Sequence, residues 1–518
     1  MMRPAAELSD NGTRCDGACG RLNLFAGEPL ISWRKQNKDL CHRCADFFKH
    51  RKSTGWSSDH QKASSNGIVS LTTISEDAFG WTPFHWACFV GNDQIGDSSR
   101  NDILRADQLG QNALMLACRS GSLSTVMKLS ASVHHEDWCI QDHLGRNTLA
   151  HSCNGGSASV TEFLLNLRLF DGRLDSPDDT GFTYLQGAIL LGNFELTKLL
   201  VEAGCNVNAP SDEGLSALLL AVQGIDGPLG ATEIFTELLL KYGADPDLRT
   251  ASGMTPLLIA SYAGNVALAT LLVNNKADLH SCDNDGCNAL YFASKSPMEQ
   301  NEDEYCPEGV IKEKEYTGMI EFLYSHGVNI NQCDEEGVTP LLLACEEGNE
   351  EVVETLLRLG ADPKVANSVN GFSALHYAAQ NENCDGQFIR LLLKCGADVN
   401  AVTKEEKLTP LHLSALLCSI EVVKALVENG ANVNALDTDG DTALHNCAGK
   451  HNGTDRAEIV EYLLENGAEF INKGNANGFT PLAAAAAAEN RQVAAILIKR
   501  GAEKLSVTPW IENKKRKL

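Results

Sequence analysis

Four cysteines near the start of the 518-residue sequence stand in two close pairs. Cys15 and Cys19 form the first pair, and Cys41 and Cys44 follow after 21 intervening residues. Two such pairs suit tetrahedral zinc, because each pair forms a compact turn and the ion draws the thiolates together. The short polar segment around them could hardly fold without a metal. We therefore predict one zinc ion held by these four thiolates; the alternative is four ordinary reduced thiols.

Cations and aromatic side chains surround the second cysteine pair. Residues 45–52 are expected to form a helix that carries two phenylalanines and then a run of cations. Binding of duplex DNA needs phosphate neutralisation by Lys and Arg together with side chains that reach base edges. The head supplies cations, among them Arg34, Arg43, Lys49, Arg51 and Lys52, and Arg34 or Arg43 could make a bidentate contact to guanine. A small zinc module also suits a protein-binding role, and His42 or His50 is an alternative zinc ligand.

Together with Trp33-Arg34, the pair at Cys41 and Cys44 makes this head similar to a GATA-type zinc finger. In that family a Trp-Arg pair lies between the knuckles, and the second Cys-x-x-Cys opens a helix in the major groove. The resemblance implies that the four cysteines hold zinc and that Trp33 packs the small core. It also implies that Arg34, Arg43, Lys49, Arg51 and Lys52 approach DNA. Here the first pair is wider by one residue, the central spacing is longer, and His42-Arg43 replaces the usual Asn-Ala. The second pair also resembles the first module of nuclear-receptor DNA-binding domains, whose second cysteine module is missing.

Most of the remaining sequence repeats a block at a spacing of about 33 residues. Each block opens with a turn and Thr-Pro-Leu-His-like residues, and it closes with an apolar helix that ends in Gly-Ala. The clearest openings lie at residues 80–85, 253–258, 337–342, 371–376, 408–412, 440–445 and 478–482. The clearest closings lie at residues 199–204, 238–244, 356–361, 391–397, 426–431 and 463–468. About twelve copies are expected with the weaker ones, which begin near Gly110, Gly145, Gly181, Gly214 and Gly286.

The residue types of the block predict a turn followed by two short helices. Asp or Asn before Gly supplies the positive φ of a tight turn. Thr offers its hydroxyl as an N-cap, and Pro at the first helical position gives up a donor that has no partner there. A closing Gly ends the second helix in the left-handed conformation. Since one unit cannot bury its apolar face alone, the units are expected to stack.

The block resembles the ankyrin repeat, and the resemblance covers residues 78–504. It implies a mostly α fold: an ankyrin-repeat solenoid of stacked helix pairs with β-turn fingers, preceded by the small zinc-stabilised module. It also implies a protein partner, bound through the turn tips and the inner helical surface. An acidic insertion at 294–316 and expansions at 224–231, 381–387 and 449–456 are expected to project as loops that either contact a partner or only add surface length.

Catalytic patterns are not recognisable in the sequence. It contains no phosphate-binding Gly-rich loop with its Lys, no His-Glu-x-x-His pair and no Gly-x-Ser-x-Gly elbow. We therefore predict a protein that is not an enzyme and has no small-molecule substrate. The cysteines, histidines and asparagines that recur with the repeat are expected to pack or brace it: Cys88, Cys118, Cys153, Cys345, His85, His376, His412, His445, Asn208, Asn400 and Asn434.

Charge is unevenly distributed along the chain. The net charge is −25, which argues against wrapping the whole molecule around nucleic acid, yet residues 33–52 and the last six residues are basic. The final run fits a basic nuclear-import signal, with a solvated charge run as the alternative. Its residues are Lys514, Lys515, Arg516 and Lys517.

No secretory signal is visible at the start, and the longest apolar run is far short of the roughly 20 residues that a membrane helix needs. The 18 cysteines are therefore expected as reduced thiols or metal ligands. The expected segments are a flexible N-terminus at 1–13, a zinc-finger-like module at 14–52, a linker at 53–77, the repeat array at 78–504 and a basic tail at 505–518.

These features predict a nuclear regulatory adaptor whose zinc head contacts DNA while the solenoid binds a protein. The competing interpretation is a cytoplasmic ankyrin scaffold whose zinc head is a protein-binding module. We expect nuclear localisation, and the sequence leaves a cytoplasmic share open.

Overall fold

The computed structural model of the chain describes residues 80–503, apart from 97, 171–173, 176, 178–180, 225–230, 296–313, 382, 418–419 and 450–455. Within these residues the chain is mostly helical and contains no β-strand. Isolated bridges join Cys282 to Asn288 and Ala366 to Ser373 at the bases of two turns. The predicted zinc-finger-like module, the linker and the basic tail lie outside the described residues.

Short helices follow one another in pairs, as the repeat predicts. Eleven described pairs run from α5 and α6 to α25 and α26, and α3 with the short α4 precedes them. The first helices are α3 (Pro83–Phe89), α5 (Ala113–Ser120), α7 (Thr148–Asn154), α9 (Tyr184–Leu190), α11 (Ala217–Val222), α13 (Pro256–Tyr262), α15 (Ala289–Ser294), α17 (Pro340–Glu347), α19 (Ala374–Gln380), α21 (Pro410–Leu417), α23 (Ala443–Ala448) and α25 (Pro481–Ala487).

The second helices are the other members of these pairs. They are α4 (Arg100–Leu104), α6 (Leu123–Ser130), α8 (Ala158–Asn166), α10 (Phe194–Glu202), α12 (Ala231–Lys241), α14 (Val266–Asn274), α16 (Lys314–Ser325), α18 (Glu350–Arg358), α20 (Gly386–Lys394), α22 (Ile420–Glu428), α24 (Arg456–Glu465) and α26 (Arg491–Lys499). A single 3-10 turn, η1 (His135–Cys139), lies between α6 and α7 among the described elements.

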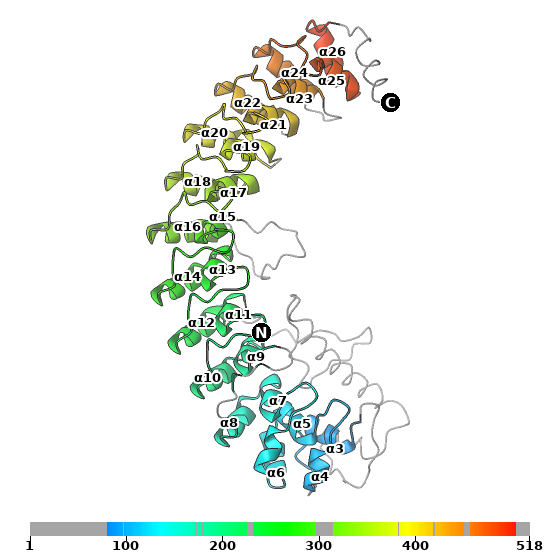
Figure 1. Ribbon diagram of the computed structural model, residues 1–518, viewed down its shortest axis with the longest axis vertical. Coiled ribbons are helices and arrows are strands. Elements are labelled where there is room, and N and C mark those ends of the chain that lie inside the picture. The colour runs from blue at the N-terminus through cyan, green and yellow to red at the C-terminus, as the bar shows by residue number, and fades with distance from the viewer. Residues whose placement is uncertain are drawn as a thin grey trace. The chain divides into compact units, whose positions relative to one another are not determined.

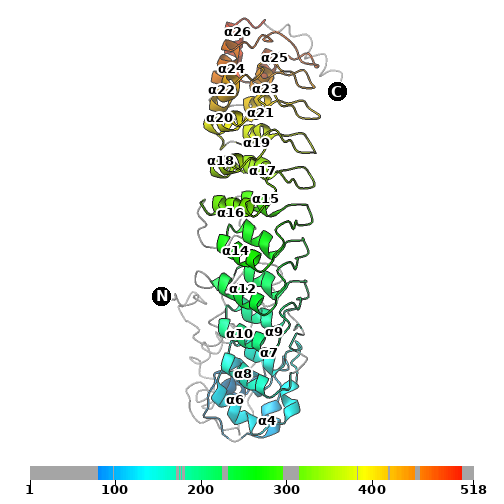
Figure 2. The ribbon, with the colours of Figure 1, turned by 90° about the vertical axis from the view of Figure 1, so that its left-hand side faces the viewer.

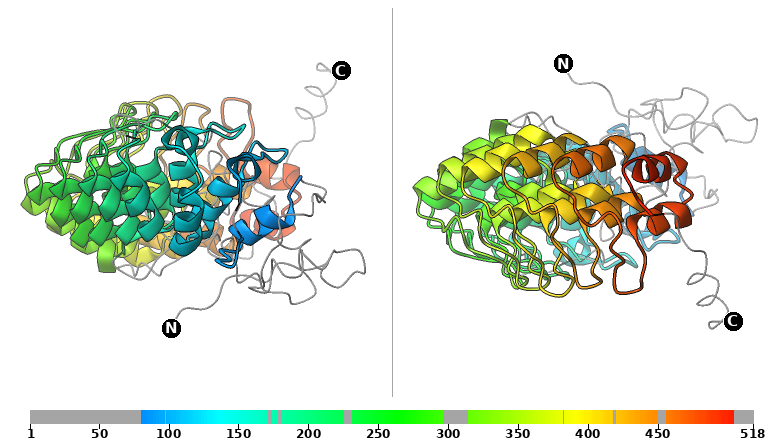
Figure 3. Two further views of the ribbon diagram at one scale, coloured as in Figure 1. Left: turned by 90° about the horizontal axis from the view of Figure 1, so that it is seen from below. Right: turned by 90° about the horizontal axis from the view of Figure 1, so that it is seen from above.

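The array divides into two compact units. Of the described residues, the first unit contains 80–259 and 267–278, and the second contains 260–266, 279–295 and 314–503, apart from the gaps given above. Within the second unit α19 packs on α21 and α20 on α22, so first helices stack on first helices and second on second (Figure 1). The two kinds of helix therefore form two adjacent rows, which Figure 3 shows for this unit from above.

Caps and glycines fix the ends of the helices where the sequence predicts them. The hydroxyls of Thr82, Thr339 and Thr480 accept hydrogen bonds from backbone N–H groups in the first turns of α3, α17 and α25, and a proline follows each threonine. Such a cap contributes about 1 kcal/mol. The second helices end at left-handed glycines with φ between 86° and 99°: Gly204, Gly243, Gly360, Gly396, Gly430 and Gly467.

Small and aliphatic side chains fill the space between the stacked pairs. Cys88, Cys118, Cys153 and Cys345 are at most 2% exposed and lie on first helices, which confirms the prediction that they pack the core. Burial raises the pKa of the Cys88, Cys118 and Cys345 thiols well above the ordinary range. These thiols are therefore poor nucleophiles in the folded protein.

The boundaries predicted for the acidic insertion need a correction. Ser294 is the last residue of α15, and α16 already begins at Lys314, so the predicted span 294–316 overlaps both helices. The Glu and Lys residues that close the insertion are good helix formers, and their polarity conceals the helix start in the sequence. Among the described helices, none is both long and apolar enough to span a bilayer.

Candidate interaction surface

Four histidines each connect their own repeat to the one that follows it. In α19 the Nδ1 atom of His376 accepts the backbone N–H of Ser373 at 3.1 Å, so this nitrogen carries no proton. The Nε2–H group therefore donates to the carbonyl of Leu408 in the following repeat, at 3.0 Å. Burial lowers the pKa of His376, which keeps the ring neutral. The same pair of contacts occurs at His85, His412 and His445. The predicted bracing role is confirmed.

Asparagines form a second set of links at the ends of the second helices. Nδ2 of Asn434 donates to the carbonyl of Gly467 at 2.8 Å, and its Oδ1 accepts the N–H of Glu469 at 3.0 Å. These bonds satisfy the backbone groups exposed at the helix end of the next repeat. Asn208 and Asn400 make equivalent pairs of contacts, so their predicted structural role is also confirmed.

The turns between successive pairs, here called the fingers, are joined to each other along the second unit. Each finger accepts a hydrogen bond from the backbone of the next, and the fingers project from one side of the helices (Figure 2). The N–H to carbonyl contacts are Ser368 to Glu336 at 2.7 Å, Lys404 to Asn370 at 2.9 Å, Thr438 to Glu406 at 3.0 Å and Ala476 to Asp439 at 2.7 Å. The fingers of this unit therefore form one continuous row.

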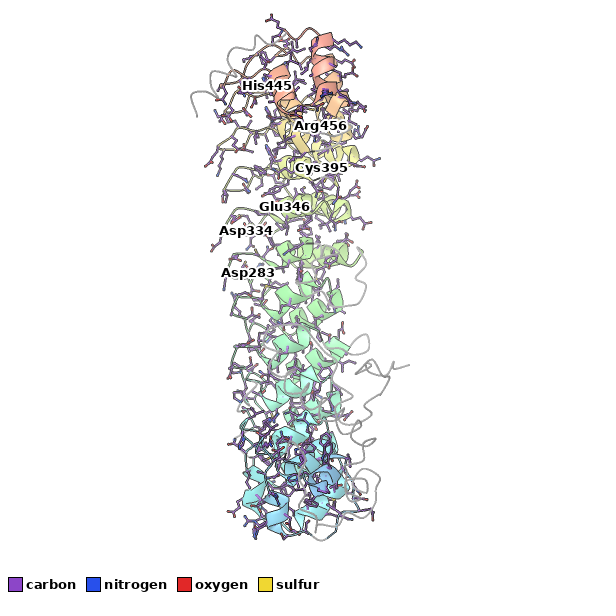
Figure 4. All side chains as sticks on the ribbon, turned by 90° about the vertical axis from the view of Figure 1, so that its right-hand side faces the viewer. Asp283, Asp334, Glu346, Cys395, His445 and Arg456 are labelled. Carbon is purple, nitrogen blue, oxygen red and sulfur yellow. The ribbon has the colours of Figure 1, made fainter. Side chains whose placement is uncertain are left out.

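Within this row, residues 334–336, 366–370, 402–406 and 436–439 define what we call the finger face. Its exposed carboxylates are those of Glu335, Glu336, Glu405, Glu406 and Asp439. Among them lie three exposed aliphatic side chains, with Val369 at 61%, Val402 at 55% and Leu436 at 39% exposure. Figure 4 shows Asp334 on the side of the fingers, with Asp283 of the preceding finger in line with it. The finger face thus combines apolar side chains with negative charge.

The inner helical surface next to the fingers is aromatic and acidic. Tyr377 on α19 accepts a hydrogen bond from Nδ2 of Asn367 at 2.8 Å through its hydroxyl oxygen. Burial raises the pKa of Tyr377, and the carboxylates of Glu346, Asp334 and Glu336 raise it further. The negative charge of the fingers therefore extends to the first helices, and a cation is the complementary group for this surface.

A buried charged cluster in the first unit was missed by the sequence analysis. The carboxylate of Asp142 accepts hydrogen bonds from Nε of Arg146 at 2.9 Å and from Nε2 of His151 at 3.0 Å. Burial alone would raise the pKa of Asp142, but His151 and Arg146 together hold it well below its usual range. Burial lowers the pKa of His151 to about 4, so the ring is neutral at pH 7.

A displaced histidine is the sequence signal for this cluster. In most repeats that contain this histidine, the histidine stands three residues after the residue that caps the first helix. His151 instead stands four residues after its capping residue, Asn147. Arg146 also occupies the position that Phe372 and Phe479 hold in later repeats. Because both changes place ionisable groups at buried positions, the cluster braces this repeat rather than exposing a reactive group.

The residues predicted to bind zinc, to contact DNA and to direct nuclear import all lie outside the described residues. They are Cys15, Cys19, Cys41, Cys44, Arg34, Arg43, Lys49, Arg51, Lys52, Lys514, Lys515, Arg516 and Lys517. Within the described ranges, no group of three or more Cys, His, Asp or Glu side chains could hold a metal ion. Among the described residues, the candidate interaction surfaces are the finger face and the inner helical surface.

Comparison with known families agrees with this architecture. A family model for three copies of the ankyrin repeat matches the chain over most of its length. The matched residues are 114–211, 218–304, 310–403, 359–437, 375–473 and 411–508. The chain therefore belongs to the ankyrin-repeat family.

Curated relatives match parts of this chain at moderate identity. The human transient receptor potential cation channel subfamily A member 1 is 25% identical over 345 residues, which are 60% of this chain and 29% of the channel. The mouse B-cell lymphoma 3 protein homolog is 32% identical over 167 residues, 32% of this chain and 36% of that protein. The putative ankyrin repeat protein L92 of Acanthamoeba polyphaga mimivirus is 28% identical over 297 residues, 56% of this chain and 66% of that protein. The chain thus spans about a third of the first two relatives.

Proposed function

We propose that this chain is a non-enzymatic nuclear regulatory adaptor, in which a zinc-bound head contacts DNA and the ankyrin solenoid binds a protein partner. Ankyrin repeats form scaffolds for protein–protein interaction, and the finger face supplies the surface for it here. The observation that carries the proposal is the hydrogen-bonded row of fingers, which holds Val402, Leu436 and the surrounding carboxylates in a fixed arrangement. A preformed surface of this kind loses little conformational entropy on binding.

The charge of the surface favours a basic partner segment. Glu335, Glu336, Glu405, Glu406 and Asp439 are exposed on the finger face, and the acidic inner surface lies beside them. Lys or Arg side chains of a partner would be attracted over about a Debye length, roughly 8 Å at physiological salt. Aliphatic or aromatic side chains between those cations would cover Val369, Val402 and Leu436. The same carboxylates repel nucleic acid, so the proposal assigns DNA contact to the head alone.

The DNA-binding part of the proposal rests on the sequence of the head. Its four cysteines have zinc-ligand spacing, and Arg43 and Lys49 lie within and directly after the second pair. Arg43 suits a bidentate contact to guanine, whereas Lys49 suits a phosphate. The alternative is a cytoplasmic scaffold whose zinc head binds protein, and it differs from the first proposal in the location of the protein and in the role of these cations.

Selection from a random pool of DNA duplexes tests the proposal. The full chain, loaded with zinc, would be used at near-physiological salt beside the Cys41→Ser/Cys44→Ser variant. We expect an enriched motif that disappears in the double variant. Arg43→Ala should weaken the enrichment at defined bases, and Lys49→Ala should weaken binding to all sequences equally. Zinc binding without an enriched motif would reject sequence recognition and favour the protein-binding alternative.

Localisation separates the two proposals by a second route. Replacing Lys514, Lys515, Arg516 and Lys517 with glutamine removes the charges of the proposed import signal. We expect the variant to leave the nucleus, while its zinc content and its solenoid remain unchanged. An unchanged distribution would show that these residues are not an import signal.

A further inference from the structure

The finger face carries apolar side chains in neighbouring fingers. Val402 and Leu436 occupy equivalent positions, because each precedes the residue whose N–H closes its own finger: Thr403 to the carbonyl of Leu408 and Asp437 to that of Asp441, both at 3.0 Å. Single exposed aliphatic residues are ordinary on protein surfaces. Two at equivalent positions in adjacent fingers, with Val369 in the finger before them, form an apolar row on the finger face.

Carboxylates surround this apolar row and restrict its ligand. Glu405 and Glu406 are exposed in the finger of Val402, and Asp439 is exposed in the finger of Leu436. Nζ of Lys404 donates to the carbonyl of Ser368, so this cation of the same finger is directed to a backbone group. A complementary segment therefore has an apolar or aromatic anchor followed by several cations.

One segment of the chain itself has this composition. Residues 504–518 contain Trp510 and Ile511, followed by the four cations at 514–517. The order matches the finger face, where Leu436 lies nearer in sequence to this segment than the carboxylates of Glu405 and Glu406.

The last described residue leads toward the fingers. The N–H of Glu503 donates to Oδ1 of Asn472 at 2.8 Å, the same contact that Glu469 makes with Asn434. After Glu469 the chain enters the finger that contains Asn475, whose Oδ1 accepts the N–H of Phe479 at 3.0 Å. By equivalence with Glu469, Glu503 itself lies on the finger side of the second unit.

The length of the segment fits the spacing of the fingers. Packed helices are separated by about 10 Å, so the finger of Leu436 lies roughly 20 Å and that of Val402 roughly 30 Å from the position of Glu503. Trp510 is seven residues beyond Glu503 and can lie up to about 24 Å away, and Lys514 up to about 36 Å. The aromatic anchor therefore reaches Leu436, and the cations reach Glu405 and Glu406.

We propose that residues 504–518 bind the finger face of the same chain, with Trp510 and Ile511 on Leu436 and Val402 and the cations on Glu405 and Glu406. Since the segment is tethered, its effective concentration is on the order of millimolar, and a weak contact suffices to occupy the surface. This inference rests on the proposed role of the finger face as an interaction surface. It adds that a basic partner must displace the tail, and that the bound tail withholds the proposed import signal.

A labelled peptide of residues 504–518 tests the contact directly. It would be titrated into the full chain and into a full-length tail variant with Trp510→Ala and all four cations replaced by glutamine. We expect the peptide to bind the tail variant about tenfold more tightly than the wild type, because the native tail competes for the same surface. Equal affinity for the two proteins, or no binding to either, would overturn the proposal.

Variants of the surface locate the site. In the tail-variant background, Val402→Asp and Leu436→Asp should each weaken peptide binding by about tenfold or more. Ile234→Asp is the matched control, since Ile234 is 52% exposed on α12 of the first unit and should have no effect. Glu405→Lys/Glu406→Lys replaces exposed side chains only, and it should weaken binding while circular dichroism confirms an unchanged fold.

A scrambled peptide tests whether the finger face recognises the residue order of this tail or any basic segment. A scrambled peptide of the same composition, with the cations divided from the Trp-Ile pair, should bind about tenfold more weakly. Equal binding of the scrambled peptide would assign the finger face to basic segments of any order and overturn the assignment to this tail. Neither result bears on DNA selection by the head, so failure here is distinct from failure of the proposed function.

Discussion

Nε2 of His151 donates a hydrogen bond to Oδ2 of Asp142 at 3.0 Å, and both side chains are fully buried. The guanidinium of Arg146 contacts the same carboxylate oxygen at 2.8 Å. Nδ1 of His151 has no hydrogen-bond partner among the described residues. Protonation of the ring would therefore place an unpaired N–H in the core, which explains why its pKa is low.

Because of this histidine, the free energy of unfolding is expected to decrease as the pH decreases. The pKa of His151 lies near 6.5 in the unfolded chain and near 4 in the folded protein, so the unfolded state binds more protons between these values. The contribution of the buried neutral ring is complete above pH 6.5 and is lost as the pH falls toward 4, by on the order of 3 kcal/mol. Urea unfolding of the wild type and of His151→Gln at pH 7 and pH 5 measures this loss of stability. The variant should be less stable at pH 7 and should show a smaller loss at pH 5, whereas His143→Gln, at an exposed position, should match the wild type. Parallel pH profiles for all three proteins would contradict this account.

The histidine bridge between repeats should be worth more than a contact within one repeat. His376→Ala removes the bond to Leu408 and leaves that carbonyl without its donor, at a cost of about 2 kcal/mol. His326→Ala is the control, because His326 is exposed and its Nδ1 contacts Phe322 and Ser325 of the adjoining helix α16. Hydrogen exchange should show faster opening of α19 and α21 in the first variant. Equal stability of the two variants would mean that the bridge does not couple the repeats.

Arg456 provides a different link between neighbouring pairs. Arg456 is 9% exposed, and its guanidinium donates to the carbonyls of Ala415 and Leu416 at the end of α21, the second at 2.8 Å. Lysine cannot reproduce this two-pronged donation. Arg456→Lys should therefore lower the free energy of unfolding by about 2 kcal/mol, and Arg390→Lys, at an exposed ion pair with Glu428, by less than about 0.5 kcal/mol. Similar losses in chemical denaturation would show that the buried geometry has no special role.

Thiol reactivity should separate surface from core cysteines. Cys333 and Cys395 are exposed, whereas Cys88, Cys118 and Cys345 are buried with raised thiol pKa values. A maleimide reagent followed by peptide mass mapping should label the two exposed residues within minutes and the three buried ones only after unfolding. Rapid native labelling of Cys345 would indicate that α17 opens readily.

The repeat could be read from the sequence because its signals are local. Thr339 caps α17 and Gly360 ends α18 through bonds within a few residues, so residue type and spacing determine both. The sequence predicts that His376 and Asn434 brace the repeat, but it does not identify their acceptors. These acceptors are the carbonyls of Leu408 and Gly467, which lie 32 and 33 residues away. The stacking of the repeats determines these acceptors, so a local sequence pattern cannot predict them.

Other features of the surface and core depend on tertiary placement. The sequence shows Val402 and Leu436 as apolar residues in an apolar-rich repeat, and only their backbone positions reveal that they face solvent. The Asp142–His151 contact arises because the histidine is displaced by one position into the core. The zinc, DNA and import residues remain predictions, since they lie outside the described residues.

Both interpretations of the head require the same metal ion, so metal content is the measurement that tests the account most directly. The full chain, purified without chelators, would be assayed for zinc by mass spectrometry beside Cys41→Ser/Cys44→Ser, with Cys333→Ser/Cys395→Ser as a matched control. The account predicts about one zinc per chain in the wild type and the control, and none in the head variant. A wild-type chain without zinc, or a head variant that retains it, would contradict the assignment of Cys15, Cys19, Cys41 and Cys44.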